Sequence, residues 1–336
     1  MKQKIRKLFL ISIFATFIVL VFLEAGAILF MYFTRGSSTV GVPERTLYLQ
    51  YQPFVMFGPD WDKVLSFDKY QRIKVNKETY RILLLGGSTA ANFPAGLLEK
   101  VFSDKFPGYK FEIINAAAGG YNARQELITA TIWGPSLKPD IIISLDGAND
   151  IIHRLRMERA GTFYLNPTYE FFIRRPGLSF LAALLIKSQF FQGLLRMREK
   201  MNVENVYNYI DAIPVYIKAQ HSINVLARGM SATRIMVLQP FMAFKQPLSA
   251  AEANFKHYKY RESVIRELYK QLNEQLINLS ANDNILYVDA RFIFNGLSHT
   301  IFSDDVHFVK NEGYYILSER IADAISEKEL LASFSK

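Results

Sequence analysis

The stretch Arg81-Ile-Leu-Leu-Leu-Gly-Gly-Ser-Thr-Ala90 decides the fold of this chain. Its apolar run is typical of a buried strand, and it stops at two glycines that a hydroxyl follows. Because glycine has no Cβ, the chain can turn sharply there and a ligand can approach the backbone. Open α/β sheets bind ligands where a parallel strand ends and a helix begins. Ser88 is therefore the first candidate site residue.

Further apolar runs of strand type follow along the chain, and helical patterns separate them. The expected strands are residues 80–85, 111–115, 140–145, 234–238 and 285–289, and the expected helices are 95–106, 122–133, 250–279 and 312–325. Short continuous apolar strands that alternate with helices predict a parallel sheet covered on both faces. With right-handed crossovers, the sequence predicts an α/β fold, a three-layer α/β/α sandwich around a five-stranded parallel sheet.

Composition bounds the class of protein. The chain has 336 residues, half of them apolar, which fits one large α/β domain with an appendage. It has no cysteine, which excludes disulfides, thiolate catalysis and cysteine-ligated metals. The net charge of +9 is too diffuse to indicate nucleic-acid binding. No dinucleotide fingerprint, phosphate-binding loop or zinc motif is present, so we expect no cofactor and no metal.

Residues 8–33 form an apolar run whose only charge is Glu24. A helix needs ~20 residues to cross a bilayer, so the run predicts a single-pass anchor that contacts membrane lipid. Four basic residues precede it. This charge distribution predicts that the N-terminus lies in the cytoplasm and that the chain after residue 33 lies outside the cytoplasmic membrane. Residues 25–27 (Ala-Gly-Ala) leave cleavage by signal peptidase as the alternative. Glu24 is either a tolerated interfacial acid or a contact with a membrane-protein partner.

The chain divides into an anchor (1–33), a linker and lead-in segment (34–75) and a catalytic domain (76–336). The long gap between the third and fourth expected strands predicts a helical insertion at about 153–232. Within it, residues 171–200 combine large apolar side chains with basic ones. That pattern fits a lid helix packed on the domain or a helix lying on an anionic membrane surface. In both interpretations we expect the insertion to border the active-site cleft.

Two more stretches supply the partners of Ser88. Residues 140–150 are a strand pattern that ends in Gly-Ala-Asn-Asp, and residues 303–308 read Ser-Asp-Asp-Val-His-Phe. A serine becomes nucleophilic when a base takes its proton, and His307 would be that base. Asp304 would fix the tautomer of His307, with Asp305 as the alternative acid. Asn149 offers two side-chain donors without charge, which suits the oxyanion of acyl transfer.

These residues resemble the SGNH/GDSL hydrolase superfamily over about residues 79–326. The four matching blocks are residues 86–88 (Gly-Gly-Ser), 115–121 (Asn-Ala-Ala-Ala-Gly-Gly-Tyr), 147–150 (Gly-Ala-Asn-Asp) and 304–307 (Asp-Asp-Val-His). The resemblance implies a flavodoxin-like fold, Ser88 as nucleophile, and an oxyanion hole of Ser88, Gly120 and Asn149. Gly87 replaces the aspartate that names the family, which looks like its Gly-Gly-Ser-Thr branch on membrane-anchored bacterial proteins.

The leading hypothesis is a serine esterase or acyltransferase outside the cytoplasmic membrane. The resemblance implies an acylated substrate such as an O-acetylated glycan or another envelope ester, attacked through an acyl-serine intermediate. The alternative is a catalytically silent envelope protein that binds glycan or forms the scaffold of a membrane complex. We interpret the other histidines as surface or structural residues, although His153 is close enough to Asn149 in sequence to line the pocket.

Overall fold

A computed structural model describes residues 2–35, Val55, 79–156, Ser188, Phe190, 212–254 and 262–328. The chain forms two compact units: Met1–Leu47 with Leu165–Asn205, and Tyr48–Tyr164 with Val206–Lys336. Most of the expected linker and of the segment 171–200 lies outside the described residues. Their assignment, and the expected position of the insertion at the cleft, therefore stay predictions.

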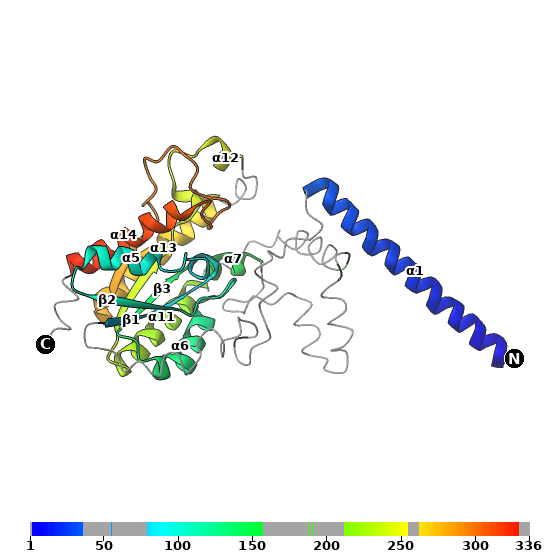
Figure 1. Ribbon diagram of the computed structural model, residues 1–336, viewed down its shortest axis with the longest axis horizontal. Coiled ribbons are helices and arrows are strands. Elements are labelled where there is room, and N and C mark those ends of the chain that lie inside the picture. Colours follow the sequence, from blue (N-terminus) through cyan, green and yellow to red (C-terminus); the bar gives the residue numbers. More distant parts are fainter. Residues whose placement is uncertain are drawn as a thin grey trace. The chain divides into compact units, whose positions relative to one another are not determined.

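The second unit contains one parallel sheet, as the sequence predicts (Figure 1). Its strands are β1 (Thr79–Gly86), β2 (Lys110–Asn115), β3 (Ile141–Asp146), β4 (Thr233–Leu238) and β5 (Leu286–Asp289). They lie in the order β2-β1-β3-β4-β5, and each pairs with its neighbour in parallel. This is the flavodoxin-like order, in which the direction of winding reverses between β1 and β3.

Helices cover both faces of this sheet, which gives the three predicted layers. One face carries α5 (Leu97–Lys105) and α14 (Asn311–Glu327), and the other carries α6 (Ala123–Leu137), α11 (Ala212–Gly229) and α13 (Glu262–Asp283). Side chains of β4 alternate between the layers because successive strand residues point to opposite faces. Ile235 and Val237 pack in the core with α14, whereas Met236 and Leu238 pack in the core with α11 and α13.

Two helical regions differ from the sequence-based expectation. The helix expected over 250–279 is instead a short α12 (Ala250–Ala253) and a separate α13, with residues 255–261 outside the described part. A serine cap with its reciprocal glutamate starts α12 at Ser249, and this local signal was missed. Helix α11 lies inside the range expected for the insertion. It packs against α6, α13 and β4, so it is the crossover helix between β3 and β4.

Helix α1 (Lys2–Arg35) belongs to the first unit. Among its described side chains, Phe14, Phe17 and Phe22 are largely exposed, at 65%, 63% and 73%. Glu24 has partners within the same unit, because its Oε2 accepts hydrogen bonds from Ser188 Oγ at 2.7 Å and from the Phe190 N–H at 3.1 Å.

Among the residues that the structure describes, no helix meets the length and hydropathy of a membrane span.

The end of β1 gives a stability test. Gly86 has a φ of +150°, and a Cβ there would lie 2.4 Å from the Leu145 carbonyl oxygen. We expect Gly86→Ala to lower the free energy of unfolding by about 2 kcal/mol or more, from backbone strain and overlap together. Gly296→Ala is the control, since Gly296 also has a positive φ (+87°) but no atom within 4 Å of a built Cβ. Denaturant unfolding measures both, and equal losses would contradict the steric explanation.

Candidate active site

Ser88 lies where β1 ends and the short helix α4 (Ser88–Ala91) begins. The first helical turn is held by the Ala91 N–H, which donates to the Gly87 carbonyl at 2.9 Å. Asn115, the first residue of the second sequence block, donates from Nδ2 to the Ala90 carbonyl at 2.9 Å. The hydroxyl therefore sits on a turn that is fixed from two neighbouring strands, at the carboxyl edge of the sheet.

The space beside Gly87 is taken up by the side chain of Asn149. A Cβ built on Gly87 would lie 2.2 Å from Asn149 Nδ2, and 3.3 Å from the Tyr121 carbonyl oxygen. No side chain fits there unless Asn149 moves. The glycine thus lets the amide of Asn149 approach the backbone next to the nucleophile.

The structure brings Ser88, His307 and Asp304 into one chain of contacts. The distance from His307 Nε2 to Ser88 Oγ is 2.7 Å, and from His307 Nδ1 to Asp304 Oδ2 it is 2.6 Å. The other carboxylate oxygen, Asp304 Oδ1, accepts the backbone N–H groups of Val306 at 2.9 Å and His307 at 2.8 Å. These distances match the hydrogen-bonded order of a catalytic triad.

The charge of Asp304 fixes the histidine tautomer. Burial alone would raise the pKa of Asp304, but the hydrogen bond and charge of His307 and two backbone N–H groups outweigh it, so the pKa lies below its usual value. An ionised carboxylate only accepts hydrogen bonds, so His307 Nδ1 must carry the proton. Nε2 is then free to accept the hydrogen of the Ser88 hydroxyl, as a general base must.

Asp305, the alternative acid, has a different contact. Its backbone carbonyl accepts the N–H of Met242 at 2.8 Å, which ties the loop of residues 303–307 to the segment after β4. The side chain that meets the imidazole is that of Asp304. The structure therefore favours Asp304 as the acid, and its catalytic role stays a prediction.

The segments that carry the other two expected oxyanion donors, Gly120 and Asn149, lie close to the turn of Ser88. A Cβ built on Gly119 would lie 4.0 Å from the Ser88 Cβ, so the second block passes directly by the nucleophile. The next residue, Gly120, has a φ of +82°, a conformation that favours glycine and turns the backbone at this point. Asn149 Nδ2 donates to the Tyr121 carbonyl at 2.8 Å. An amide nitrogen carries two hydrogens, so one remains for a ligand.

Two supporting residues were missed in the sequence: Thr89 directly follows the first block, and Asp150 is the last residue of the third. Thr89 is buried and donates from Oγ1 to the Val306 carbonyl at 3.1 Å, so it links the turn of Ser88 to the loop of His307. Asp150 accepts the Ala123 N–H at 3.3 Å on both carboxylate oxygens, which joins the third block to the start of α6. Their position directly after Ser88 and Asn149 was the available signal.

Below the oxyanion side lies a buried polar network. Asp146 accepts hydrogen bonds from Tyr216 Oη and Gln220 Nε2, both at 2.5 Å. Burial, and then the charge of Asp146, raises the pKa of Glu126 and of Asp150 well above the usual range. Burial also lowers the pKa of Arg234 to about 10. Burial therefore disfavours a negative charge on Glu126 and on Asp150, which directly follows Asn149.

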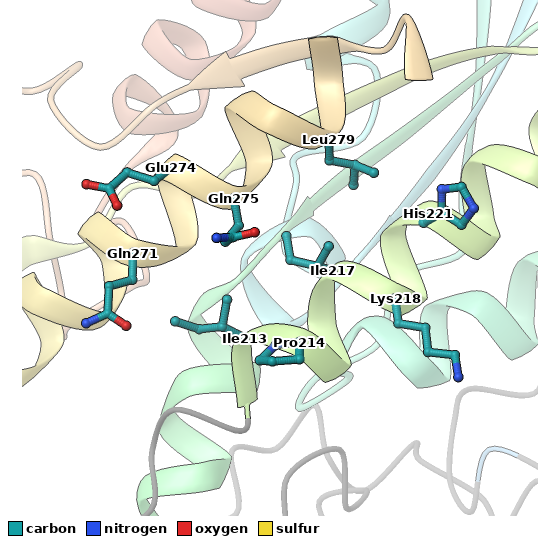
Figure 2. Close-up of a pocket in the computed structure, with 9 residues that line it drawn as sticks. All are labelled: Ile213, Pro214, Ile217, Lys218, His221, Gln271, Glu274, Gln275 and Leu279. Carbon is teal, nitrogen blue, oxygen red and sulfur yellow. The ribbon is translucent and has the colours of Figure 1, made fainter. Parts of the chain in front are cut away.

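A groove of about 600 Å³ lies away from these residues, between α11 and α13 (Figure 2). Ile213, Pro214, Ile217 and Leu279 form its apolar part, and none of the triad residues lines it. His221 at its edge pairs with Asp283 at 2.6 Å.

His299 pairs with Glu312 at 3.0 Å on the surface. The side chains of His153 and His257 lie outside the described residues, so the interpretation of His153 stays a prediction. Within the part of the chain that the structure describes, no group of three or more acidic or histidine side chains is placed to hold a metal ion.

Comparisons with known proteins give likenesses of structure only. No protein-family model matches the chain, and no curated protein matches it significantly. An acetyl xylan esterase structure aligns with a TM-score of 0.46 and 12% identity, over 73% of this chain and 99% of that one. A putative acylhydrolase from Bacteroides fragilis aligns with a TM-score of 0.44 and 15% identity, over 81% of this chain and 99% of that one. A GDSL-like lipase from Bacteroides thetaiotaomicron aligns with a TM-score of 0.44 and 14% identity, over 79% of this chain and 99% of that one.

At these scores the likenesses carry no argument about activity. The sheet order and the contacts among the four sequence blocks are more informative. They place a hydroxyl, an imidazole, a carboxylate and an amide at the carboxyl edge of the sheet. These are the chemical groups that acyl transfer through a serine requires.

Thr89 allows a test of the link between the two catalytic loops. Thr89→Val keeps the shape of the side chain but removes the hydrogen bond to Val306. The net value of such a bond is about 1 kcal/mol, so we expect ester turnover to fall about fivefold. Thr89→Ser retains the hydroxyl and should restore most of the rate. Equal rates in the two variants, measured with a small acetyl ester, would exclude the link.

The choice of acid is tested by two matched variants. Asp304→Asn should lower kcat for a small ester by about 10² to 10⁴-fold, because the amide no longer holds the imidazole as a carboxylate does. Asp305→Asn leaves the backbone contact with Met242 in place and should be far less impaired. Steady-state kinetics decide this, and the reverse order would identify Asp305 as the acid.

Proposed function

We propose that this protein is a serine esterase or acyltransferase that works through an acyl-serine intermediate. The observation that carries the proposal is the continuous contact from Asp304 through His307 to Ser88, at 2.6 Å and 2.7 Å. Two further observations support it: Gly119 passes close to the Ser88 side chain, and the Asn149 amide lies beside Gly87. The substrate we propose is an O-acetylated glycan or another ester of the cell envelope, which the motif resemblance supports.

Acylation follows from the geometry. His307 Nε2 accepts the proton of Ser88 as its Oγ attacks the carbonyl carbon of the ester, and Asp304 stabilises the imidazolium that forms. The negative charge that develops on the carbonyl oxygen meets the N–H groups of Ser88 and Gly120 and the remaining hydrogen of Asn149. The intermediate then collapses, and His307 returns its proton to the departing alcohol.

The second half-reaction decides between the two activities. Water or a sugar hydroxyl gives its proton to His307 and attacks the acyl-serine, which releases Ser88 again. Attack by water is ester hydrolysis, and attack by a sugar hydroxyl is acyl transfer. Both use the same residues in the same roles, so the proposal covers both.

We also propose that residues 8–33 anchor the protein in the cytoplasmic membrane with the catalytic domain outside. The apolar run with a single charge and the basic residues before it support this location. Glu24 forms hydrogen bonds with Ser188 and Phe190, so its contacts include residues of this chain. A membrane-protein partner for Glu24 stays a proposal.

The nucleophile is tested with a fluorophosphonate probe, which reacts covalently with activated serines. We expect labelling of the wild-type protein at Ser88, and none in Ser88→Ala. His307→Ala should lose nearly all labelling and turnover of a small acetyl ester. Because residues of one triad act as a unit, the double variant should be little worse than either single one. Full activity in Ser88→Ala, with the fold intact by circular dichroism, would overturn the proposal.

The location has its own test. A reporter fused after Lys336 should be active only outside the cytoplasm, and the protein should stay in the membrane fraction after a high-salt wash. Loss to the soluble fraction would argue against an anchor. A mature N-terminus at Ile28, found by mass spectrometry, would show cleavage instead.

A further inference from the structure

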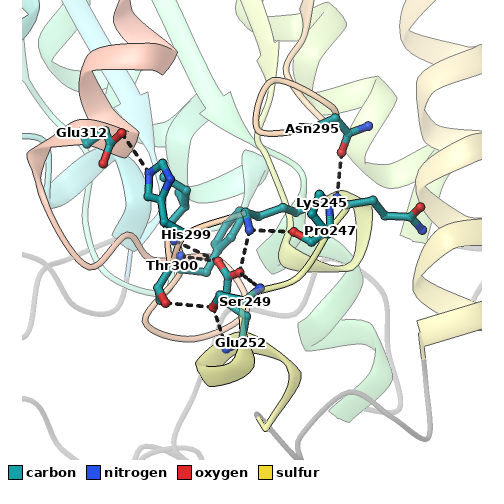
Figure 3. A network of polar contacts seen from close by, with 11 residues as sticks. Lys245, Pro247, Ser249, Glu252, Asn295, His299, Thr300 and Glu312 are labelled. Atoms are coloured by element: carbon teal, nitrogen blue, oxygen red, sulfur yellow. Dashed lines mark hydrogen bonds and ion pairs between the residues drawn. The ribbon is translucent and has the colours of Figure 1, made fainter. Parts of the chain in front are cut away.

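Figure 3 shows a buried polar network around Lys245 and Glu252, whose contacts reach the residues just before the loop of the proposed acid and base. Lys245 Nζ and Glu252 Oε2 are 2.7 Å apart, and both side chains have 0% exposure. Lys245 follows η4 (Met242–Phe244), and Glu252 is in α12. Lys245 also donates to the Pro247 carbonyl at 2.9 Å, so both residues belong to the segment that follows β4.

Glu252 binds backbone as well as lysine. Its Oε1 accepts the N–H of Ile301 at 2.9 Å and of Phe302 at 3.0 Å, while its Oε2 also accepts the N–H of Ser249 at 2.8 Å. Burial alone would raise the pKa of Glu252, but the bond from Lys245 and these N–H groups keep it below its usual value. The carboxylate is therefore charged, and both of its oxygens accept hydrogen bonds. One of them, Oε1, binds the N–H groups of residues 301 and 302.

Residues 301 and 302 form the base of the catalytic loop. Phe302 pairs with Phe308 in an antiparallel bridge, and the Val309 N–H donates to the Ile301 carbonyl at 2.8 Å. The Ser303 N–H donates to the His307 carbonyl at 2.8 Å, which closes the loop. Glu252 holds the outer edge of this base. Movement of the base would carry His307 and Asp304 together, relative to Ser88 at the start of α4.

We propose that Lys245 and Glu252 are positioning residues that set the distance between His307 and Ser88. This inference rests on the proposed function and deepens it. A buried ion pair is weak evidence for stability, because removing two charges from water costs about as much as their attraction returns. Here the pair presents a fixed acceptor to two N–H groups at the foot of the loop. Lys245 keeps that acceptor charged and in place.

The design of the test separates the acceptor from the charge. Lys245→Met/Glu252→Gln removes both charges but keeps a carbonyl oxygen for the N–H groups of Ile301 and Phe302. Lys245→Met/Glu252→Leu removes the charges and the acceptor at similar side-chain volume. Both double variants and wild type are assayed with p-nitrophenyl acetate and with the fluorophosphonate probe. Thermal unfolding compares their stability.

We expect the glutamine version to keep kcat within about threefold of wild type. The leucine version should lose about 10 to 100-fold in kcat with an unchanged KM, since a displacement near 1 Å can cost about 10²-fold. Its pH profile should keep the wild-type midpoint, because Asp304 and His307 move as one. Equal kcat in two folded double variants would overturn the positioning role. Failure of wild type to react with the probe would instead contradict the proposed function.

If the leucine version does not fold, two less disruptive variants of Thr300 test the positioning role. Thr300 Oγ1 and Ser249 Oγ are 2.8 Å apart at the partly buried rim of the same contact set. Thr300→Val removes this bond with little change of shape, and Thr300→Ser keeps it. We expect kcat to fall about two- to fivefold in the valine variant and to recover in the serine variant. Equal kcat in both would overturn the proposal.

Discussion

The site depends on the absence of two side chains at the end of β1. Gly86 is in register with Leu145 of β3, and a Cβ on Gly86 would meet the Leu145 carbonyl. At Gly87 the amide of Asn149 occupies the place of a side chain. These close approaches draw the ends of β1 and β3 together at the winding reversal. The amide of Asn149, from the segment that follows β3, can therefore lie next to the turn of Ser88.

The other half of the site arrives on a loop more than two hundred residues later, and polar contacts bring it into place. Thr89 holds the loop beside the nucleophile, the Met242 N–H holds it from the segment after β4, and Glu252 holds its base. Hydrogen bonds are directional, whereas apolar contacts tolerate sliding. Such contacts suit a loop whose imidazole must remain within hydrogen-bonding distance of one hydroxyl.

The sequence predicted the sheet well because each strand is a short apolar run bounded by turn residues, and all five appear within a few residues of their expected bounds. It also named Ser88, Asn149, Asp304 and His307, since short motifs carry their chemistry. Lys245 and Glu252 could not be found this way. Because lysine and glutamate are mostly exposed in folded proteins, their sequence positions predict surface residues. Only the tertiary packing shows that this pair is buried. The start of α12 is a different case, because the capping box of Ser249 and Glu252 is a local signal that the helical periodicity concealed.

The buried carboxyl groups of Glu126 and Asp150 have an electrostatic consequence for the oxyanion. A pocket that must stabilise a developing negative charge is weakened by any fixed anion nearby, since little water screens it. Burial, and then the charge of Asp146, raises the pKa of both groups well above the usual range, so a negative charge on either of them is disfavoured. Burial thus acts against two further anions close to the residue that has to bind one.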